Sequence, residues 1–392
     1  MRAPVAATIA RTTAGNSAVI LADPTAATAA EDTQRNAQGA AVLAGRPVVS
    51  VAHDADEQAR NLVGWRQTYD QLAAGRFVGT LTEMPLDTMK VFRETTSHTL
   101  RQACEVRGDA YWFGIPVRGQ GDMRIDAQWV DANAFALRPG NVEFELLTPA
   151  QFSIYGVVVR GDVLRHYAAS VEHKDFDACV PHAPIVRASP VRIERLCALL
   201  ARQLDVARED VEGRHGGESD RASAGTRLAS LAEAERCGSQ ADIQADIQAE
   251  VLAALFDACA GDGRDANPAC GGGVEGDARV MAESGARRRW IVDQAREYVL
   301  AHRARAVGVP ELCEQLLVSR RTLQYCFQDV LGMAPATYLR ALRLNGARRD
   351  LCTQAGSVQD VAAAWGFWHL SQFSADYRRM FGMRPSEALR AS

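Results

Sequence analysis

Residues 310–332 read PELCEQLLVSRRTLQYCFQDVLG, and this stretch decides the fold of the C-terminal part of the chain. Pro310 suits a first helical residue, where the missing N–H has no helical partner in any case. Ser319 is a good N-cap for a second helix over residues 320–331. Gly332 suits the position just after that helix, where φ is often positive. The stretch therefore predicts a short helix, a tight turn and a second helix, which is a helix-turn-helix.

The same pattern returns nearer the C-terminus. Ser357 with Asp360 three residues later forms a capping box ahead of a short helix. Gly366 then makes a turn, and residues 369–381 give another helix, which is expected to be buried through Leu370, Phe373 and Tyr377. A longer helix over residues 336–352 joins the two units and spans about 25 Å, enough to hold two recognition helices about one DNA turn apart. One helix-turn-helix is weak support for DNA binding, but two in tandem predict an all-α DNA-binding domain.

The distribution of charge along the chain also indicates that the C-terminal part binds DNA. Residues 287–392 hold 16 Arg against 9 Asp or Glu, a net charge of +7. The rest of the chain holds 28 basic and 39 acidic residues, a net charge of −11. A basic domain on an acidic body predicts a local site for a polyanion such as double-stranded DNA.

Polar side chains on the exposed starts of the two recognition helices are the expected base contacts, since Arg reads guanine and Gln reads adenine in the major groove. They are Arg320, Arg321, Gln324 and Tyr325 on the first helix and His369, Ser371 and Gln372 on the second, with Arg378 and Arg379 as phosphate partners. For Arg320 and Arg321, contact with phosphate alone is an equal alternative. Trp365, Phe367 and Trp368 are expected to pack in the core or the turn rather than to stack on bases.

The N-terminal half has a different texture. Short runs of Val, Ile, Phe and Tyr separated by Gly and Pro predict a small antiparallel sheet or barrel, with strands over residues 111–117, 134–137, 142–147 and 152–159. Upstream, Leu62, Trp65, Tyr69 and Leu72 recur at spacings of three and four, which predicts an amphipathic helix over residues 61–72.

The expected fold class is α+β, and five segments follow from these textures. They are a disordered leader (1–60), a β-rich effector-sensing domain with flanking helices (61–172), a helical region that could form a homodimer (173–260), a flexible Gly-rich linker (261–286) and the double helix-turn-helix domain (287–392). The leader lacks the features of a signal peptide. No run approaches about 18 apolar residues, so no membrane span is expected.

An enzyme is the less favoured class. The sequence contains no GxxxxGK[ST], GxSxG or HExxH motif, so no catalytic residue or catalytic cofactor is expected. The eight histidines show no metal-ligand spacing, and the nine cysteines form no CxxC pair. Reduced thiols in a cytoplasmic protein are the expected state.

Four stretches of the C-terminal domain resemble the AraC/XylS family of transcriptional regulators. They are SRRTLQYCF at 319–327, RLNGARR at 343–349, WGFWHLSQF at 365–373 and DYRRMFGMRPS at 376–386. Leu317 departs from the family pattern, because the first turn usually carries Gly at that place. If the backbone there needs a positive φ, Leu317 is strained.

The N-terminal half resembles, within that family, the regulators of ethanolamine-utilisation operons, at residues 65–72, 91–94, 100–104, 112–116, 138–140 and 143–145. The resemblance implies a cupin-like sensor domain and an activator of ethanolamine catabolic genes that works with RNA polymerase and responds to ethanolamine and adenosylcobalamin. An AraC/XylS-type regulator of another catabolic operon, with a different small-molecule effector, stays open. The chain contains no Asp-x-His-x-x-Gly cobalamin signature, so a corrinoid would have to bind in another way.

Ethanolamine is a small cation at neutral pH, so a carboxylate inside an aromatic wall is the expected recognition chemistry. For each such residue alone, an ordinary place in the core or on the surface is the simpler interpretation. The candidates are Glu94, Glu143 and Glu145 for the carboxylate and Trp65, Trp112, Phe113 and Trp129 for the wall.

Overall fold

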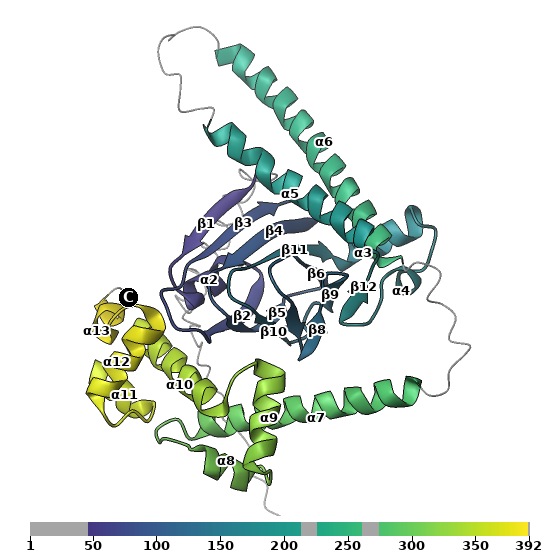
Figure 1. Cartoon of the computed structure of the whole chain (residues 1–392). Coiled ribbons are helices and arrows are strands. Elements are labelled where there is room, and N and C mark those ends of the chain that lie inside the picture. Colours follow the sequence, from purple (N-terminus) through teal and green to yellow (C-terminus); the bar gives the residue numbers. More distant parts are fainter. Residues whose placement is uncertain (1–45, 213–225, 261–273, 391–392) are drawn as a thin grey trace, which may run out of the picture. The chain divides into compact units, whose positions relative to one another are not determined.

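Two antiparallel sheets form the N-terminal domain in the computed structural model, which describes residues 46–212, 226–260 and 274–390 (Figure 1). Within these ranges the seven-stranded sheet runs in the order β1 (Val48–Ala52), β3 (Gly79–Pro85), β4 (Met89–Thr96), β11 (Phe152–Arg160), β6 (Ala110–Pro116), β9 (Ala134–Pro139) and β12 (Ile185–Arg187). The five-stranded sheet runs in the order β2 (Trp65–Gln71), β5 (Leu100–Val106), β10 (Phe144–Thr148), β7 (Met123–Ile125) and β8 (Gln128–Val130).

The larger sheet is buried on both faces. One face packs against the smaller sheet through a core that includes Phe92, Trp112 and Ile154. The opposite face, with Val91 and Val157, lies under three helices: α3 (Gly161–Ser170), α5 (Pro190–Glu212) and α6 (Thr226–Cys259), while α4 (Phe176–Cys179) adds Phe176 at the margin. A sheet covered on both faces needs near-continuous apolar strands, and β11 is buried at seven of its first eight positions, all but Val158.

Two expectations for the N-terminal segment are wrong. The predicted helix over residues 61–72 is wrong, since Trp65–Gln71 form the strand β2; a spacing of four residues, as between Trp65 and Tyr69, fits a strand as well as a helix. The predicted leader over residues 1–60 is too long, since it contains β1 and all but the last residue of the helix α2 (Ala55–Asn61). Asp54 caps α2 by accepting a hydrogen bond from the backbone N–H of Glu57 at 2.7 Å. Residues 1–45 lie outside the described residues.

The helices α5 and α6 bury their apolar faces inside the chain itself. Leu196 and Leu200 of α5 and Leu255 of α6 lie in one core with the larger sheet. The expected helical region (173–260) is therefore present, although it also contains the short strand β12. Its role in a homodimer stays a prediction.

The predicted C-terminal boundary of the linker over residues 261–286 is wrong, because a helix begins inside this range. Residues 261–273 lie outside the described residues, but the helix α7 (Val274–Ala301) begins twelve positions before the predicted end. The sequence after residue 276 is rich in Ala, Arg, Met and Glu, which favour a helix.

The C-terminal domain follows the prediction closely. Its helices are α8 (Val309–Gln315), α9 (Arg320–Leu331), α10 (Pro335–Cys352), α11 (Val358–Ala364), α12 (Leu370–Phe381) and α13 (Pro385–Arg390). Leu323, Phe327, Phe373 and Tyr377 are fully buried in a single core, as their helical spacing predicts. Leu370, which we expected in that core, is instead 42% exposed because it lies in the first turn of α12.

The α+β class and the β-rich domain are confirmed, whereas the cupin-like assignment stays a prediction. None of the helices that the structure describes is long and apolar enough to cross a membrane.

Candidate functional site

The first helix-turn-helix consists of α8, a short turn and α9. Ser319 caps α9, and its side chain accepts a hydrogen bond from the backbone N–H of Thr322 at 3.0 Å. Leu317 lies in the turn with φ of 51°, so the strain expected from its departure from the family pattern is confirmed. Its side chain is 91% exposed and recovers little of that strain by packing.

The second helix-turn-helix consists of α11, its turn and α12. Ser357 and Asp360 form the predicted capping box, with both side chains bonded to backbone N–H groups. Gly366 makes the turn at φ of 71°, and a Cβ there would approach the carbonyl carbon of Arg305 to 2.7 Å. Only glycine meets both conditions.

The three aromatic residues of this turn have different positions. Trp365 is buried, and its indole N–H donates a hydrogen bond to Asp350 at 2.7 Å. Gly346 on α10 makes room for this ring, since a Cβ there would lie 2.1 Å from it. Phe367 is half-buried with its ring centroid 4.9 Å from that of Phe373. Trp368 is 72% exposed, so our expectation that it packs in the core or the turn is wrong.

The exposed face of α9 carries the four predicted base-contact residues Arg320, Arg321, Gln324 and Tyr325. They lie on the side of the helix opposite the buried Leu323 and Phe327. Because the donors and acceptors of this face point away from the core, they are free to meet base edges in a groove.

The position of the Tyr325 ring is fixed by a neighbouring arginine. The guanidinium of Arg288 lies 5.3 Å from the Tyr325 ring and 2.7 Å from the carboxylate of Asp329 one turn further along α9. This cation–π contact and ion pair restrict the ring to the exposed side of the helix.

On the second recognition helix, His369 is the N-cap residue rather than part of α12, and Ser371 and Gln372 lie exposed in the first turn. Gln372 donates a hydrogen bond to the carboxylate of Asp376 at 3.0 Å, and Arg379 forms an ion pair with the same carboxylate. The Asp376 side chain, in a residue that is 3% exposed, thus holds the exposed Gln372 and Arg379 side chains in position.

Arg378 lies exposed beside Arg379 in the last turn of α12. The nine predicted DNA contacts are therefore all on the surface, on two repeated units of one domain. Contact with DNA itself stays a prediction for each of them, and Trp368, which we expected in the core or the turn, is an exposed aromatic residue on the same unit as α12.

A second candidate site lies between the two sheets of the β-rich domain, around Glu94. The Glu94 side chain, which is 4% exposed, accepts hydrogen bonds from the Gln58 amide at 2.9 Å and from the Tyr69 hydroxyl at 3.2 Å. Among the residues that the structure describes, no Lys, Arg or His forms an ion pair with this carboxylate. Burial raises its pKa to about 7, although the two hydrogen bonds favour the charged form.

Aromatic rings lie in the same core. Trp65 packs edge-on against Phe92, Trp112 and Phe144 at centroid distances of 6.3, 5.7 and 6.2 Å, and Trp112 stacks on Phe144 at 5.0 Å. Within the described part of the chain, the indole N–H of Trp112 and the amide oxygen of Gln58 are buried without a hydrogen-bond partner. Buried polar atoms are nearly always hydrogen-bonded, so these two atoms are available to bind a polar ligand.

Two glycines make this arrangement possible. Gly114 on β6 pairs with Gly156 on β11 across the larger sheet. A Cβ on Gly114 would lie 2.3 Å from the Trp112 ring, and one on Gly156 would lie 2.0 Å from the Phe92 ring. Both rings therefore lie flat over the sheet where side chains are absent.

The structure divides the predicted effector residues into two groups. Trp65, Glu94 and Trp112 share the core described above, and we name these three with Gln58, Tyr69, Phe92 and Phe144 the inner cluster. Phe113 faces the opposite side of the sheet, toward α3 and α5, so its placement with the wall is wrong.

The other two carboxylates lie outside the core. Glu143 has a side chain that is 82% exposed, and Glu145 forms an ion pair with Arg101. Both line a cleft of about 510 Å³ between the smaller sheet and α7. Trp129 is 55% exposed, with the Arg124 guanidinium 3.8 Å from its ring. Glu143, Glu145 and Trp129 thus cannot join Glu94 around one ligand.

Sequence reasoning missed Gln58, Tyr69, Phe92 and Phe144. A strand reading of residues 65–71 would have placed Trp65, Gln67 and Tyr69 on one face, but the partners from other strands carry no local signal. In the part of the chain that the structure describes, no three His, Cys, Asp or Glu side chains gather as a metal site requires.

Comparison with known proteins places the C-terminal domain. Residues 312–391 match the family model described as a helix-turn-helix domain. The probable thc operon regulatory protein of Rhodococcus erythropolis is 37% identical over 103 residues, which are 26% of this chain and 31% of that protein. The XylDLEGF operon transcriptional activator 2 of Pseudomonas putida is 35% identical over 88 residues, which are 22% of this chain and 56% of that protein.

Among solved structures, the transcriptional regulator of Chromobacterium violaceum with an AraC-type DNA-binding domain is 30% identical, with a TM-score of 0.26, and the match covers 27% of this chain and 94% of that one. The chain matches about a third to just over half of the length of the two curated relatives. Residues 312–391 are thus similar to a helix-turn-helix domain, and the two curated relatives that share this part of the chain are named as a probable operon regulatory protein and an operon transcriptional activator.

Proposed function

We propose that this protein is a sequence-specific DNA-binding regulator of transcription. The observation that supports the proposal best is the repeated helix-turn-helix, in which α9 and α12 each present an exposed polar start while the opposite face is buried in one core. The net charge of +7 on residues 287–392 supplies attraction for the phosphate backbone.

A titration of the full-length protein on DNA from its own upstream region tests this proposal. The logarithm of the binding constant is expected to fall linearly and steeply with the logarithm of the salt concentration, because Arg–phosphate contacts release counterions. Equal affinity for that DNA and for a shuffled sequence of the same length would contradict sequence-specific binding.

The finer proposal is an activator of ethanolamine catabolic genes that binds ethanolamine at the inner cluster. Ethanolamine offers an ammonium group for the Glu94 carboxylate and aromatic faces, and a hydroxyl for an unpaired polar atom such as the Gln58 amide oxygen. A cation beside Glu94 would also remove the cost of burying its charge.

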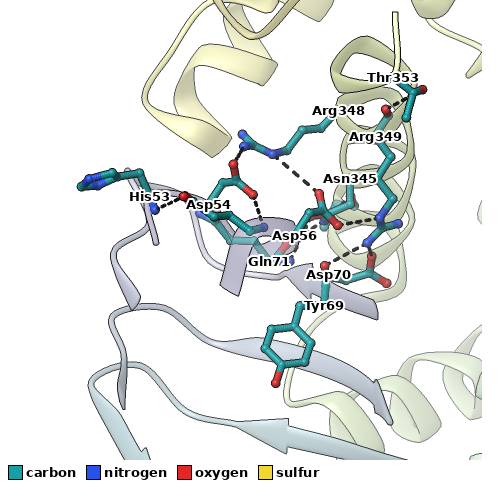
Figure 2. Close-up of polar contacts among 12 residues, drawn as sticks. His53, Asp54, Asp56, Tyr69, Asp70, Gln71, Asn345, Arg348, Arg349 and Thr353 are labelled. Atoms are coloured by element: carbon teal, nitrogen blue, oxygen red, sulfur yellow. Dashed lines mark hydrogen bonds and ion pairs between the residues drawn. The ribbon is translucent and has the colours of Figure 1, made fainter. Parts of the chain in front are cut away.

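An effector at the inner cluster would act close to the elements that touch the DNA-binding domain. In α2, Gln58 bonds to Glu94, while Asp56 pairs with Arg349 of α10 at 2.9 Å. In β2, the Tyr69 hydroxyl bonds to Glu94, while the Tyr69 carbonyl and the next residue, Asp70, bond to Arg349. Figure 2 shows the Tyr69 ring pointing away from α10 and Asp70 reaching toward it. A small shift of α2 or β2 upon binding would therefore reach α10 directly.

Calorimetry with the full-length protein tests the effector. Ethanolamine is expected to bind more tightly at pH 8 than at pH 6, because Glu94 ionises with a pKa of about 7. Ethylene glycol, which replaces the ammonium group by a hydroxyl, is the matched control ligand and is expected not to bind. Unchanged ethanolamine affinity in a Glu94→Gln variant would contradict this site.

Three parts of the proposal rest on the sequence resemblance. They are adenosylcobalamin as a second effector, RNA polymerase as a partner and ethanolamine catabolic genes as targets. A regulator of another catabolic operon, with a different small cation as effector, fits the inner cluster equally well. A cytoplasmic location and a homodimer complete the proposal.

A further inference from the structure

The β-rich domain contacts the ends of both recognition helices. The described residues from 46 onward belong to one compact unit, and three of the places where its two domains meet bear on the recognition helices, in addition to the ion pair of Arg289 on α7 with Asp126 at 2.6 Å. Two of these places are the C-terminal ends of α9 and α12, and the third is the middle of α10, the helix that joins the two helix-turn-helix units.

At the end of α9 the contact is an arginine. Arg124 on β7 donates hydrogen bonds to the backbone carbonyls of Asp329 and Val330, the second at 2.6 Å. These carbonyls lie in the last turn of the helix, where no intrahelical N–H remains to reach them. A cation at this end also complements the helix dipole. Trp129 stacks on the guanidinium at 3.8 Å and holds it in place.

At the end of α12 the contact is a backbone loop. The Gln71 side chain and the backbone N–H of Gly75 both donate to the carbonyl of Met380, at 2.9 and 3.0 Å. The loop lies so close that a Cβ on Gly382 would approach the Arg76 Cβ to 2.9 Å. The residue after α12 is thus glycine for two reasons, its φ of 71° and its contact with the β-rich domain.

Between these ends, α10 is held by main-chain and charged contacts. Asn345 accepts a hydrogen bond from the Gln71 N–H at 3.0 Å and donates one to the Gln71 carbonyl at 2.9 Å. Arg348 pairs with Asp54 at 2.7 Å, and Arg349 bonds to Asp70 at 2.5 Å (Figure 2). Asn345 and Arg348 are 1% and 4% exposed, so α10 is closely covered along this side.

The same contacts leave the DNA face open. Arg320, Arg321 and Gln324 lie at the N-terminal start of α9 and are exposed, whereas Arg124 holds the opposite end of that helix. In α12, Ser371 and Gln372 lie exposed at the start, and the loop holds Met380 near the end. The contacts are therefore compatible with DNA binding and do not mask it.

From this arrangement we infer that the β-rich domain is a brace that fixes the spacing and relative rotation of the two recognition helices. Without it, the two units are joined by α10, by the core around α10 and by the contact of the Gly366 turn with Arg305, and rotations about α10 alter their alignment more readily. With it, both far ends are tied to one sheet. The braced protein should therefore accept one spacing between its two DNA subsites, and the inference rests on the proposed DNA binding.

The test uses the full-length protein on its operator, with one base pair inserted between the two subsites. Each inserted base pair moves one subsite by about 3.4 Å and turns it by about 35°. The wild type is expected to lose affinity at least about tenfold, which is about 1.4 kcal/mol. Arg124→Gln, which releases the end of α9, is expected to lose about threefold or less relative to its own binding to the native operator. Arg107→Gln changes an exposed arginine of the same domain and should behave as the wild type.

Arg349→Gln provides a second test. It removes the contacts of α10 with Asp56 and Asp70 of the β-rich domain, and the changed residue lies in the DNA-binding domain. The brace is overturned if both variants respond to the insertion as steeply as the wild type. It is also overturned if they bind the native operator more tightly with unchanged spacing preference, since the contacts would then be inhibitory. A wild type without specific DNA binding would overturn the proposed function, and the brace with it.

Discussion

Replacing Glu94 by Gln is expected to stabilise the β-rich domain above neutral pH, because it removes a buried charge. Burial raises the pKa of Glu94 from 4.5 to about 7, so the folded chain holds this proton more tightly than the unfolded chain does. The stability that this group supplies is complete below about pH 4.5 and is lost as the pH rises through about 7. Between pH 5 and pH 8 the loss is on the order of 2 kcal/mol, since one pKa unit corresponds to about 1.4 kcal/mol.

The titratable groups next to Glu94 do not change their protonation between pH 5 and pH 8. Tyr69 and Cys104 face the same carboxylate, and burial raises the pKa of each well above its ordinary value. Both therefore stay protonated from pH 5 to pH 8, and Glu94 is the group of the inner cluster that titrates there.

Urea unfolding of the full-length wild type and Glu94→Gln at pH 5 and pH 8 measures the effect. Glu143→Gln, which neutralises an exposed carboxylate of the same domain, is the control. Hydrogen exchange of β2 and β4 assigns the change to the β-rich domain, because a chain of several domains need not unfold in one step. The reasoning is refuted if Glu94→Gln and the wild type show the same pH dependence, or if the control shows the change as well.

The remaining predictions concern the DNA-binding domain. Arg321→Ala and Gln324→Ala are each expected to reduce discrimination between operator and mutated operator by about 1–3 kcal/mol, measured by competition binding, whereas Arg378→Ala should weaken all sequences alike. Equal loss on both DNAs for Arg321→Ala would make it a phosphate contact. Leu317→Gly is expected to stabilise the domain by about 0.5–1 kcal/mol in urea, because it relieves a left-handed backbone at an exposed site. Ser357→Ala should destabilise it by about 1 kcal/mol through loss of the capping box, and an unchanged midpoint would count against that role.

The C-terminal domain was predictable because its signals are local. Ser319 and Ser357 cap helices, and Gly332 ends α9 at φ of 72°, so each boundary is written in a few adjacent residues. The prediction went wrong at Trp368 and Leu370, which are apolar yet exposed. Helical periodicity assigns such residues to the core, whereas a surface that binds another molecule can keep them outside.

The β-rich domain was predicted in class but not in detail, because its contacts are long-range. Gln58 and Glu94 are 36 positions apart and come from a helix and a strand. Trp65 and Tyr69 fit both a helix and a strand, and the pairing of β2 with β5 decides between them. Three effector candidates that meet in the core could be named from the sequence, namely Trp65, Glu94 and Trp112. The sequence does not show on which face of its sheet each residue lies, so the separation of these three from Glu143 and Glu145 became visible only in the structure.

Footprinting of the full-length protein on its upstream DNA tests the central claim most directly. Two recognition helices joined by α10 should protect two major-groove segments, centred about 10 base pairs apart on one face of the duplex. Alanine at Arg321 should weaken protection of one segment first, and alanine at Gln372 should weaken the other. A single protected segment, or uniform protection along the fragment, would contradict a regulator that reads DNA with two helix-turn-helix units.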